Sequence, residues 1–161
     1  MQRLIDSAPT FMMRIIVMAQ GTGMRRNEIL QLKWKWVNLE EGIVEIPAEI
    51  TKNSESRMIR LFPHVIKMLK GIPRFSHTDN VFLSSENRPI PYFTTYCRKI
   101  WRETLERAGI EDAVFHDLRH DFVTKASRSG NDDASLMLQV GHKTPAMLHR
   151  YRIKAKQDLI N

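Results

Sequence analysis

The sequence predicts an α+β fold that is mainly α-helical and carries a small three-stranded antiparallel sheet. Apolar residues recur at helical spacing near both ends of the chain, and three short β-type segments lie between them. The length of 161 residues and the 42% hydrophobic content suit a compact domain with a buried core. The sequence contains no internal repeat or linker, so we expect one domain over residues 1–161.

The first third of the chain carries helix signals followed by strand signals. Apolar residues at helical spacing predict a helix over residues 9–20, with Ser7 as its N-cap and Gly21 at its end. A second, short helix begins at about Arg25. Polar turns then separate three strands, which we expect to pair as the antiparallel sheet. These strands span residues 36–39, 43–46 and 58–61.

The rest of the chain is predicted to be helical. Phe93, Cys97 and Trp101 share one face of the strongest periodic stretch, which ends at Gly109. Cys97 is the only cysteine, and its place in this apolar face predicts a buried structural thiol that forms no disulfide. Thr144 is the candidate N-cap of the final helix. The predicted helices span residues 63–69, 91–108, 118–129, 133–140 and 145–152.

The chain is basic, with a net charge of +7 and a pI of about 9.8. Its lysines and arginines are scattered along the sequence, so the charge belongs to a folded surface. Such a surface favours a polyanionic partner, because each phosphate neutralised by a basic side chain releases a condensed counterion. Apolar stretches such as residues 15–18 are far shorter than the roughly 20 residues of a membrane span. We therefore expect no membrane partner and a cytoplasmic location.

Four short segments combine polar side chains with tight local structure. In chain order they are residues 22–25, residues 51–52, residues 116–120, and residues 141–142 followed by 149–151. Residues 22–34 read T-G-M-R-R-N-E-I-L-Q-L-K-W, and residues 116–120 read H-D-L-R-H. This order of segments resembles the tyrosine recombinase family of phage integrases and Xer-type recombinases, whose patterns are T-G-L-R-x-x-E-I-L-x-L-x-W and H-x-L-R-H. The resemblance extends over essentially the whole chain.

The resemblance implies a set of site residues, position by position. Arg25 and Arg119 match the two catalytic arginines of the family. Tyr151, nine residues after His142, matches its nucleophile. The complete catalytic set implied is Arg25, Lys52 as the β-hairpin lysine, His116, Arg119, His142 and Tyr151, with Glu28 as the acidic residue that supports the first arginine.

The chemistry of these side chains suits phosphodiester cleavage without a metal or nucleotide cofactor. A tyrosine attacks as its phenolate, which is costly because the reference pKa is about 10, and nearby cations reduce that cost. The planar guanidinium groups of Arg25 and Arg119 fit the non-bridging oxygens of a pentacoordinate phosphate. We assign Lys52 as the general acid for the leaving 5′-oxygen, with His116 assisting proton transfer and His142 binding the phosphate.

The resemblance also implies a reaction and its partners. The reaction is site-specific cleavage and rejoining of DNA through a covalent 3′-phosphotyrosine, which conserves the bond energy without ATP. The substrate is double-stranded DNA, bound by full-length family members as tetramers, and there is no small-molecule substrate. Because the chain begins almost directly at the first helix of the catalytic domain, we expect a fragment that lacks the amino-terminal core-binding domain. Such a fragment should have little complete recombination activity alone.

Two positions depart from the family pattern. Met24 replaces the usual leucine, and Arg60 stands where the family often has proline in R-x-V-P-L. Neither side chain belongs to the proposed chemistry. Arg60 is expected either to add a backbone contact or to project outward.

Other functions remain open at the level of sequence. Residues 133–151 hold two helices around a glycine turn, which resembles a DNA-binding helix-turn-helix without catalysis. A type IB topoisomerase has a similar mechanism but relaxes DNA without strand exchange. His116 and His120 have the spacing of zinc ligands on a helix, but the intervening Arg119 disfavours a metal, so we expect a structural role for His120. No feature favours a purely structural or protein-binding domain.

Overall fold

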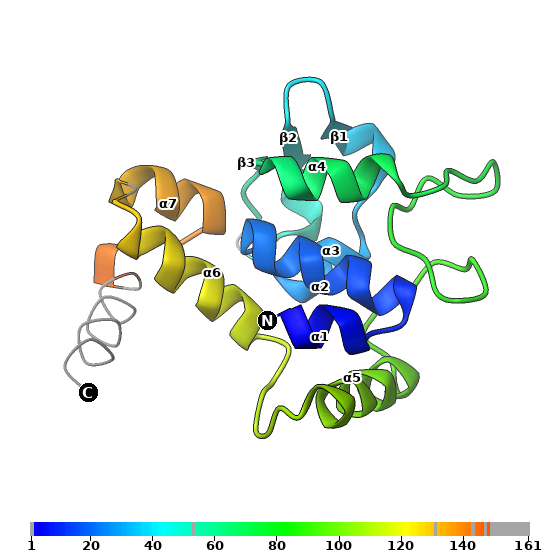
Figure 1. Cartoon of the computed structure of the whole chain (residues 1–161). Helices are drawn as coiled ribbons and strands as arrows, with labels where there is room; N and C mark the ends of the chain where they lie inside the picture. Colours follow the sequence, from blue (N-terminus) through cyan, green and yellow to red (C-terminus); the bar gives the residue numbers. More distant parts are fainter. Residues whose placement is uncertain (1, 53, 131, 143, 147, 149–161) are drawn as a thin grey trace.

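Helices make up most of the structure and a small sheet lies at one side of them (Figure 1); the structure is a computed structural model that describes residues 2–52, 54–130, 132–142, 144–146 and 148. The described α-helices are α1 (Gln2–Ser7), α2 (Thr10–Thr22), α3 (Arg26–Leu30), α4 (Pro63–Lys70), α5 (Thr95–Ala108), α6 (Asp117–Arg128) and α7 (Asp133–Val140). The strands are β1 (Val37–Asn38), β2 (Ile43–Ile46) and β3 (Arg57–Arg60), and the 3-10 helices are η1 (Trp34–Trp36) and η2 (Ala48–Ile50). The predicted fold class is confirmed.

The central helix of the fold is α2. Its apolar residues recur every three or four positions, so that Met12, Ile15 and Ile16 are fully buried. Helices α1, α3, α4, α5 and α6 all pack against it, and Figure 1 shows α2 between α4 and α1. The chain leaves the carboxyl end of α2 through Gly23 and enters α3. The first predicted catalytic arginine lies at that turn.

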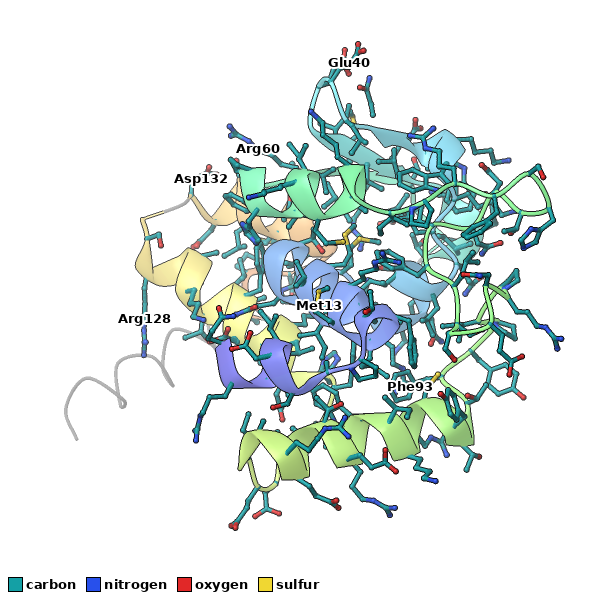
Figure 2. The ribbon with its side chains drawn as sticks, turned by 45° about the vertical axis from the view of Figure 1, so that its right-hand side comes forward. Met13, Glu40, Arg60, Phe93, Arg128 and Asp132 are labelled. Carbon is teal, nitrogen blue, oxygen red and sulfur yellow. The ribbon has the colours of Figure 1, made fainter. Side chains whose placement is uncertain are left out.

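The three strands pair antiparallel in the order β1-β2-β3, and Val44 of β2 pairs with Ile59 of β3. Val44, Ile46 and Ile59 are buried while their neighbours along the strands are more exposed, so one face of the sheet joins the core. The β1–β2 hairpin carries Glu40 away from the helices (Figure 2). The connection from β2 to β3 passes through η2 and holds Lys52 in an exposed turn.

A second apolar cluster holds α6 and α7 against the end of α2. Its buried members are Phe122, Val123, Leu136, Val140 and Leu148. The turn at Gly23 meets this cluster, because a Cβ there would lie 2.5 Å from Cδ1 of Phe122. The φ angle of Gly23 is 68°, so both the backbone conformation and the close packing require glycine. This packing brings the start of α6 and the end of α7 to the α2–α3 turn.

Several element boundaries differ from those predicted. The short helix α1 was not expected, and Ser7, the predicted N-cap, is its last residue; an extended Pro9 precedes α2 without a side-chain cap. Helix α5 begins at Thr95, later than predicted, because the Thr94 hydroxyl accepts a hydrogen bond from the backbone N–H of Cys97. The expected burial of Cys97 is confirmed.

The final predicted helix, over residues 145–152, is described only in part. Pro145, Ala146 and Leu148 are helical, whereas residues 149–152 lie outside the described residues. None of the helices in the described ranges is both long and apolar enough to cross a membrane.

Candidate active site

Arg25 is the N-cap residue of α3, and Glu28 in the first turn of that helix holds it. The backbone N–H of Arg25 donates to Oε2 of Glu28 over 2.8 Å, and its Nη1 donates to Oε1 over 3.2 Å. This local capping arrangement fixes the backbone and the side chain of Arg25 together. Its Nη2 donates to the carbonyl oxygen of Gly141 over 3.1 Å, which connects α3 to the end of α7.

Arg119 lies on α6, is 4% exposed, and reaches two neighbouring elements. Its Nη1 donates to the carbonyl oxygen of Gly23, and its Nη2 donates to that of Val140 over 2.6 Å. Val140 and Gly141 are adjacent at the end of α7, so the two predicted catalytic arginines bind successive carbonyl groups. The partial negative charge of a helix carboxyl terminus stabilises both cations.

Gly141 ends α7 with a φ of 67° and lets the arginines approach its backbone. A Cβ at this position would lie 3.3 Å from Nη1 of Arg25 and 3.2 Å from Nε of Arg57. His142 follows, and its backbone N–H donates to the carbonyl oxygen of Met137 over 3.0 Å. The glycine therefore allows the chain to turn so that His142 comes next to the arginines.

His142 is 9% exposed and lies close enough to both arginines to feel their charge. Burial lowers its pKa, and the charges of Arg119 and Arg25 lower it further, to about 4. The imidazole is therefore neutral at physiological pH. In that form one ring nitrogen donates a hydrogen bond and the other accepts one.

His116 and His120 lie one turn apart at the start of α6, with ring centroids 4.6 Å apart in an edge-to-face arrangement. His116 is exposed and His120 is half-buried. Partial burial of its ring lowers the pKa of His116, and the charges of His120 and Arg119 lower it further. In the part of the chain that the structure describes, no three His, Cys, Asp or Glu side chains are grouped to hold a metal ion.

Lys52 occupies the exposed turn before β3 and lines a surface hollow of about 540 Å³ together with Arg25 and His116. A second hollow, of about 340 Å³, lies between Arg25 and His142. Arg25 and Thr51 border both hollows. The turn between β2 and β3 therefore meets α3, α6 and α7 around Arg25.

The predicted site residues that the structure brings together are Arg25, Glu28, Lys52, His116, Arg119 and His142. Tyr151, the predicted nucleophile, lies outside the described residues, and no geometry is assigned to it.

Sequence reasoning missed Arg57, the first residue of β3. Its Nη1 and Nη2 donate to Oε1 and Oε2 of Glu28 over 3.0 Å and 2.6 Å. Burial raises the pKa of Glu28, but the hydrogen bonds and charges of Arg57 and Arg25 outweigh burial and hold the pKa below its ordinary value. A signal was available in the sequence, because Arg57 is the arginine of the R-x-V-P-L pattern in which Arg60 replaces proline.

The chain is similar in sequence and in fold to DNA recombinases and integrases. The chain is 33% identical to the shufflon-specific DNA recombinase of Escherichia coli over 85% of its own length, and 28% identical to the integrase of Salmonella phage P22 over 98%. A crystal structure of XerA recombinase superposes with a TM-score of 0.81 and 26% identity over 98% of the chain. The chain spans 33%, 43% and 60% of those three proteins, respectively.

These likenesses define the fold as the catalytic domain of a tyrosine recombinase. The profile of the phage integrase family matches residues 1–158, and the chain belongs to that family.

Proposed function

We propose that this domain cleaves and rejoins double-stranded DNA as a tyrosine-type site-specific recombinase, with Tyr151 as the nucleophile. The proposal rests on one observation. Arg119 and Arg25 donate hydrogen bonds to the successive carbonyl groups of Val140 and Gly141, respectively. Two guanidinium groups held this way form a fixed cationic site of the kind that stabilises developing negative charge on a phosphate. His142 follows directly in the chain.

In the proposed reaction the phenolic oxygen of Tyr151 attacks the phosphorus of the scissile phosphodiester. A bond from that oxygen to phosphorus forms as the bond to the 5′-oxygen breaks, which leaves a 3′-phosphotyrosine and a 5′-hydroxyl. Arg25 and Arg119 bind the non-bridging oxygens, so the step uses no metal or other cofactor. The reverse attack by a 5′-hydroxyl of another strand rejoins the DNA and releases the tyrosine.

Three side chains serve proton transfer and phosphate binding in this proposal. Lys52 protonates the leaving 5′-oxygen, and its position on an exposed turn beside the hollow of Arg25 supports this role. His116, on the same hollow, assists the transfer of the tyrosine proton. His142 is neutral because its pKa is about 4, and it donates a hydrogen bond to the phosphate.

Double-stranded DNA is the proposed partner, and no small-molecule substrate is involved. The net charge of +7 and the 33% sequence identity to the shufflon-specific DNA recombinase support this choice. The proposal includes a tetramer on DNA for the full-length protein, strand exchange through a Holliday junction, and a cytoplasmic site of action.

The decisive assay for the chemistry is covalent trapping on nicked suicide duplexes that contain the cognate site, in EDTA. We expect an adduct that survives SDS. The chain has three tyrosines, so Tyr92→Phe and Tyr96→Phe are matched controls for Tyr151→Phe. Both controls should retain the adduct, because these side chains are exposed at 64% and 49%, whereas Tyr151→Phe should abolish it. Dependence on added magnesium or zinc would overturn the metal-free step.

A second assay separates recombination from topoisomerase action. Holliday junctions formed from two duplexes are the expected product when the full-length protein is used. Relaxation of a supercoiled plasmid without any junction would instead assign the site to a topoisomerase.

A further inference from the structure

The carboxylate of Glu28 is shared by two arginines from different parts of the chain. Arg57 contributes two hydrogen bonds of 3.0 Å and 2.6 Å, and Arg25 contributes its backbone N–H at 2.8 Å and its Nη1 at 3.2 Å. Glu28 is 1% exposed, and a carboxylate has about four acceptor positions. These four donors therefore fill its hydrogen-bonding capacity.

The two arginines bind this carboxylate in different ways. Arg57 makes the two-pronged contact that is the strongest geometry between a guanidinium and a carboxylate. The Arg25 side chain makes one longer contact and directs another nitrogen to Gly141. The side chain of Arg57 is 9% exposed and that of Arg25 is 22% exposed. The deeper arginine is therefore the main counter-ion of Glu28.

The charges in this cluster have a simple consequence. Two guanidinium cations and one carboxylate leave a net charge of +1, and the more exposed cation is Arg25, which borders both hollows. If Glu28 faced Arg25 alone, the pair would be neutral, and an incoming anion would have to compete with the carboxylate of Glu28 for the Arg25 guanidinium. Acidic groups at the rims, Glu49 and Glu55, are exposed and screened by solvent.

We propose that Arg57 is a positioning residue that neutralises Glu28, so that Glu28 can orient Arg25 without cancelling its charge toward a phosphate. This inference rests on the proposed function only in naming a phosphodiester as the anion. Arg57 also bridges the sheet to α7, since its Nε donates to the carbonyl oxygen of Gln139 over 3.4 Å. The same side chain therefore sets both the charge and the position of the Arg25 site.

The test compares charge with shape at position 57. Arg57→Lys keeps the positive charge, whereas Arg57→Gln removes it and keeps a shorter, polar side chain. The double variant Glu28→Gln/Arg57→Gln removes both charges of the buried pair, so the cluster again has a net charge of +1, which Arg25 carries. Binding of inorganic phosphate to the full chain is followed through the side-chain Nε–Hε resonance of Arg25, and thermal unfolding reports whether each variant is folded.

We expect Arg57→Gln to weaken phosphate binding about tenfold, and Arg57→Lys to bind within about threefold of the unchanged chain. The double variant should bind more tightly than Arg57→Gln. A purely structural role for Arg57 predicts the opposite order, because a second substitution in the buried cluster adds damage. Equal binding by the Lys and Gln variants, or no recovery in the double variant, overturns the proposal, as does an unchanged chain that binds no phosphate.

The same variants are assayed for covalent adduct with DNA, which separates this inference from the proposed function. If the phosphate series follows the expected order but no variant forms an adduct, the charge arrangement stands and the recombinase chemistry fails. If adduct forms at equal rates in all folded variants, the inference fails while the recombinase chemistry stands. If Arg57→Gln does not fold, the comparison of Arg57→Lys with the double variant decides: both must bind phosphate.

Discussion

The side-chain amide of Gln139 pairs with the backbone of Arg60 at the outer edge of β3. The Arg60 N–H donates to Oε1 of Gln139 over 2.9 Å, and Nε2 of Gln139 donates to the Arg60 carbonyl over 3.1 Å. The same Nε2 lies 3.3 Å from the carbonyl oxygen of Thr22. Figure 2 labels Arg60 on this edge. A proline at position 60 would lack the N–H, so the departure from the family pattern permits a contact that attaches α7 to the sheet.

Replacing Gln139 should therefore loosen α7. We expect Gln139→Leu to lower the free energy of unfolding by about 1–2 kcal/mol, because it leaves backbone groups of Arg60 and Thr22 without their partner. Urea unfolding measures the change. Leu138→Ala is a matched control on the same helix, since Leu138 is 69% exposed, and its effect should stay within about 0.5 kcal/mol. Equal losses in the two variants would remove the role assigned to Gln139.

Arg119 should tolerate no conservative replacement. A lysine has one ammonium group and cannot donate to the Gly23 and Val140 carbonyls in the planar geometry of a guanidinium. Arg119→Lys should reduce single-turnover cleavage about 10²- to 10³-fold. Arg128→Lys, on the exposed end of the same helix, is the control and should cleave at the normal rate. A rate for Arg119→Lys near that of the control would contradict the assigned phosphate contact.

Gly141 and Gly130 offer a paired test of crowding at the arginines. Both have positive φ, at 67° and 76°, so alanine should destabilise each by roughly 1–2 kcal/mol. Only at Gly141 would the new Cβ press on Arg25, because no atom of the described residues lies within 4 Å of a Cβ at Gly130. Cleavage should fall by more than about tenfold in Gly141→Ala and stay near normal in Gly130→Ala. Similar cleavage rates would show that the arginines do not depend on this turn.

The buried His142 should make folding stability fall in acid. Its pKa is about 4 in the folded chain against an ordinary value of 6.5, so the unfolded chain binds the proton first as the pH falls. Stability should therefore decrease as the pH is lowered from 6.5 toward about 4, and this contribution should be constant above and below that window. Unfolding of His142→Gln, which cannot titrate, should show a shallower dependence over the same range. Parallel curves for the two proteins would contradict the assigned pKa.

Local signals in the sequence predicted the elements that local chemistry determines. Helix α7 matches its predicted span of residues 133–140, because the Asp132 side chain caps one end and Gly141 takes a left-handed conformation at the other. Strand β2 matches its span because Val44 and Ile46 alternate with a more exposed neighbour. The short helix α1 was missed because its stability comes from packing on α5, a tertiary contact that periodicity in six residues does not reveal.

In the candidate site, too, contacts between residues close in the sequence could be predicted, whereas contacts made by tertiary packing could not. Arg25 and Glu28 are three residues apart, so their pairing was accessible from the motif. Arg57 is 29 residues from Glu28, and only the fold brings them together. The meeting of Arg25 and Arg119 at the end of α7 also depends on tertiary packing. Arg25 is 116 residues from its partner Gly141, and Arg119 is 21 residues from its partner Val140.

In the proposed reaction Tyr151 becomes covalently attached to DNA, and this attachment can be mapped to a single residue. The adduct from a nicked suicide duplex is digested with nuclease and protease, and mass spectrometry identifies the peptide that carries the nucleotide. We predict a 3′-phosphate linked to Tyr151. A nucleotide on Tyr92, on Tyr96 or on any other side chain, or a linkage through a 5′-phosphate, would contradict the assignment of Tyr151 as the nucleophile.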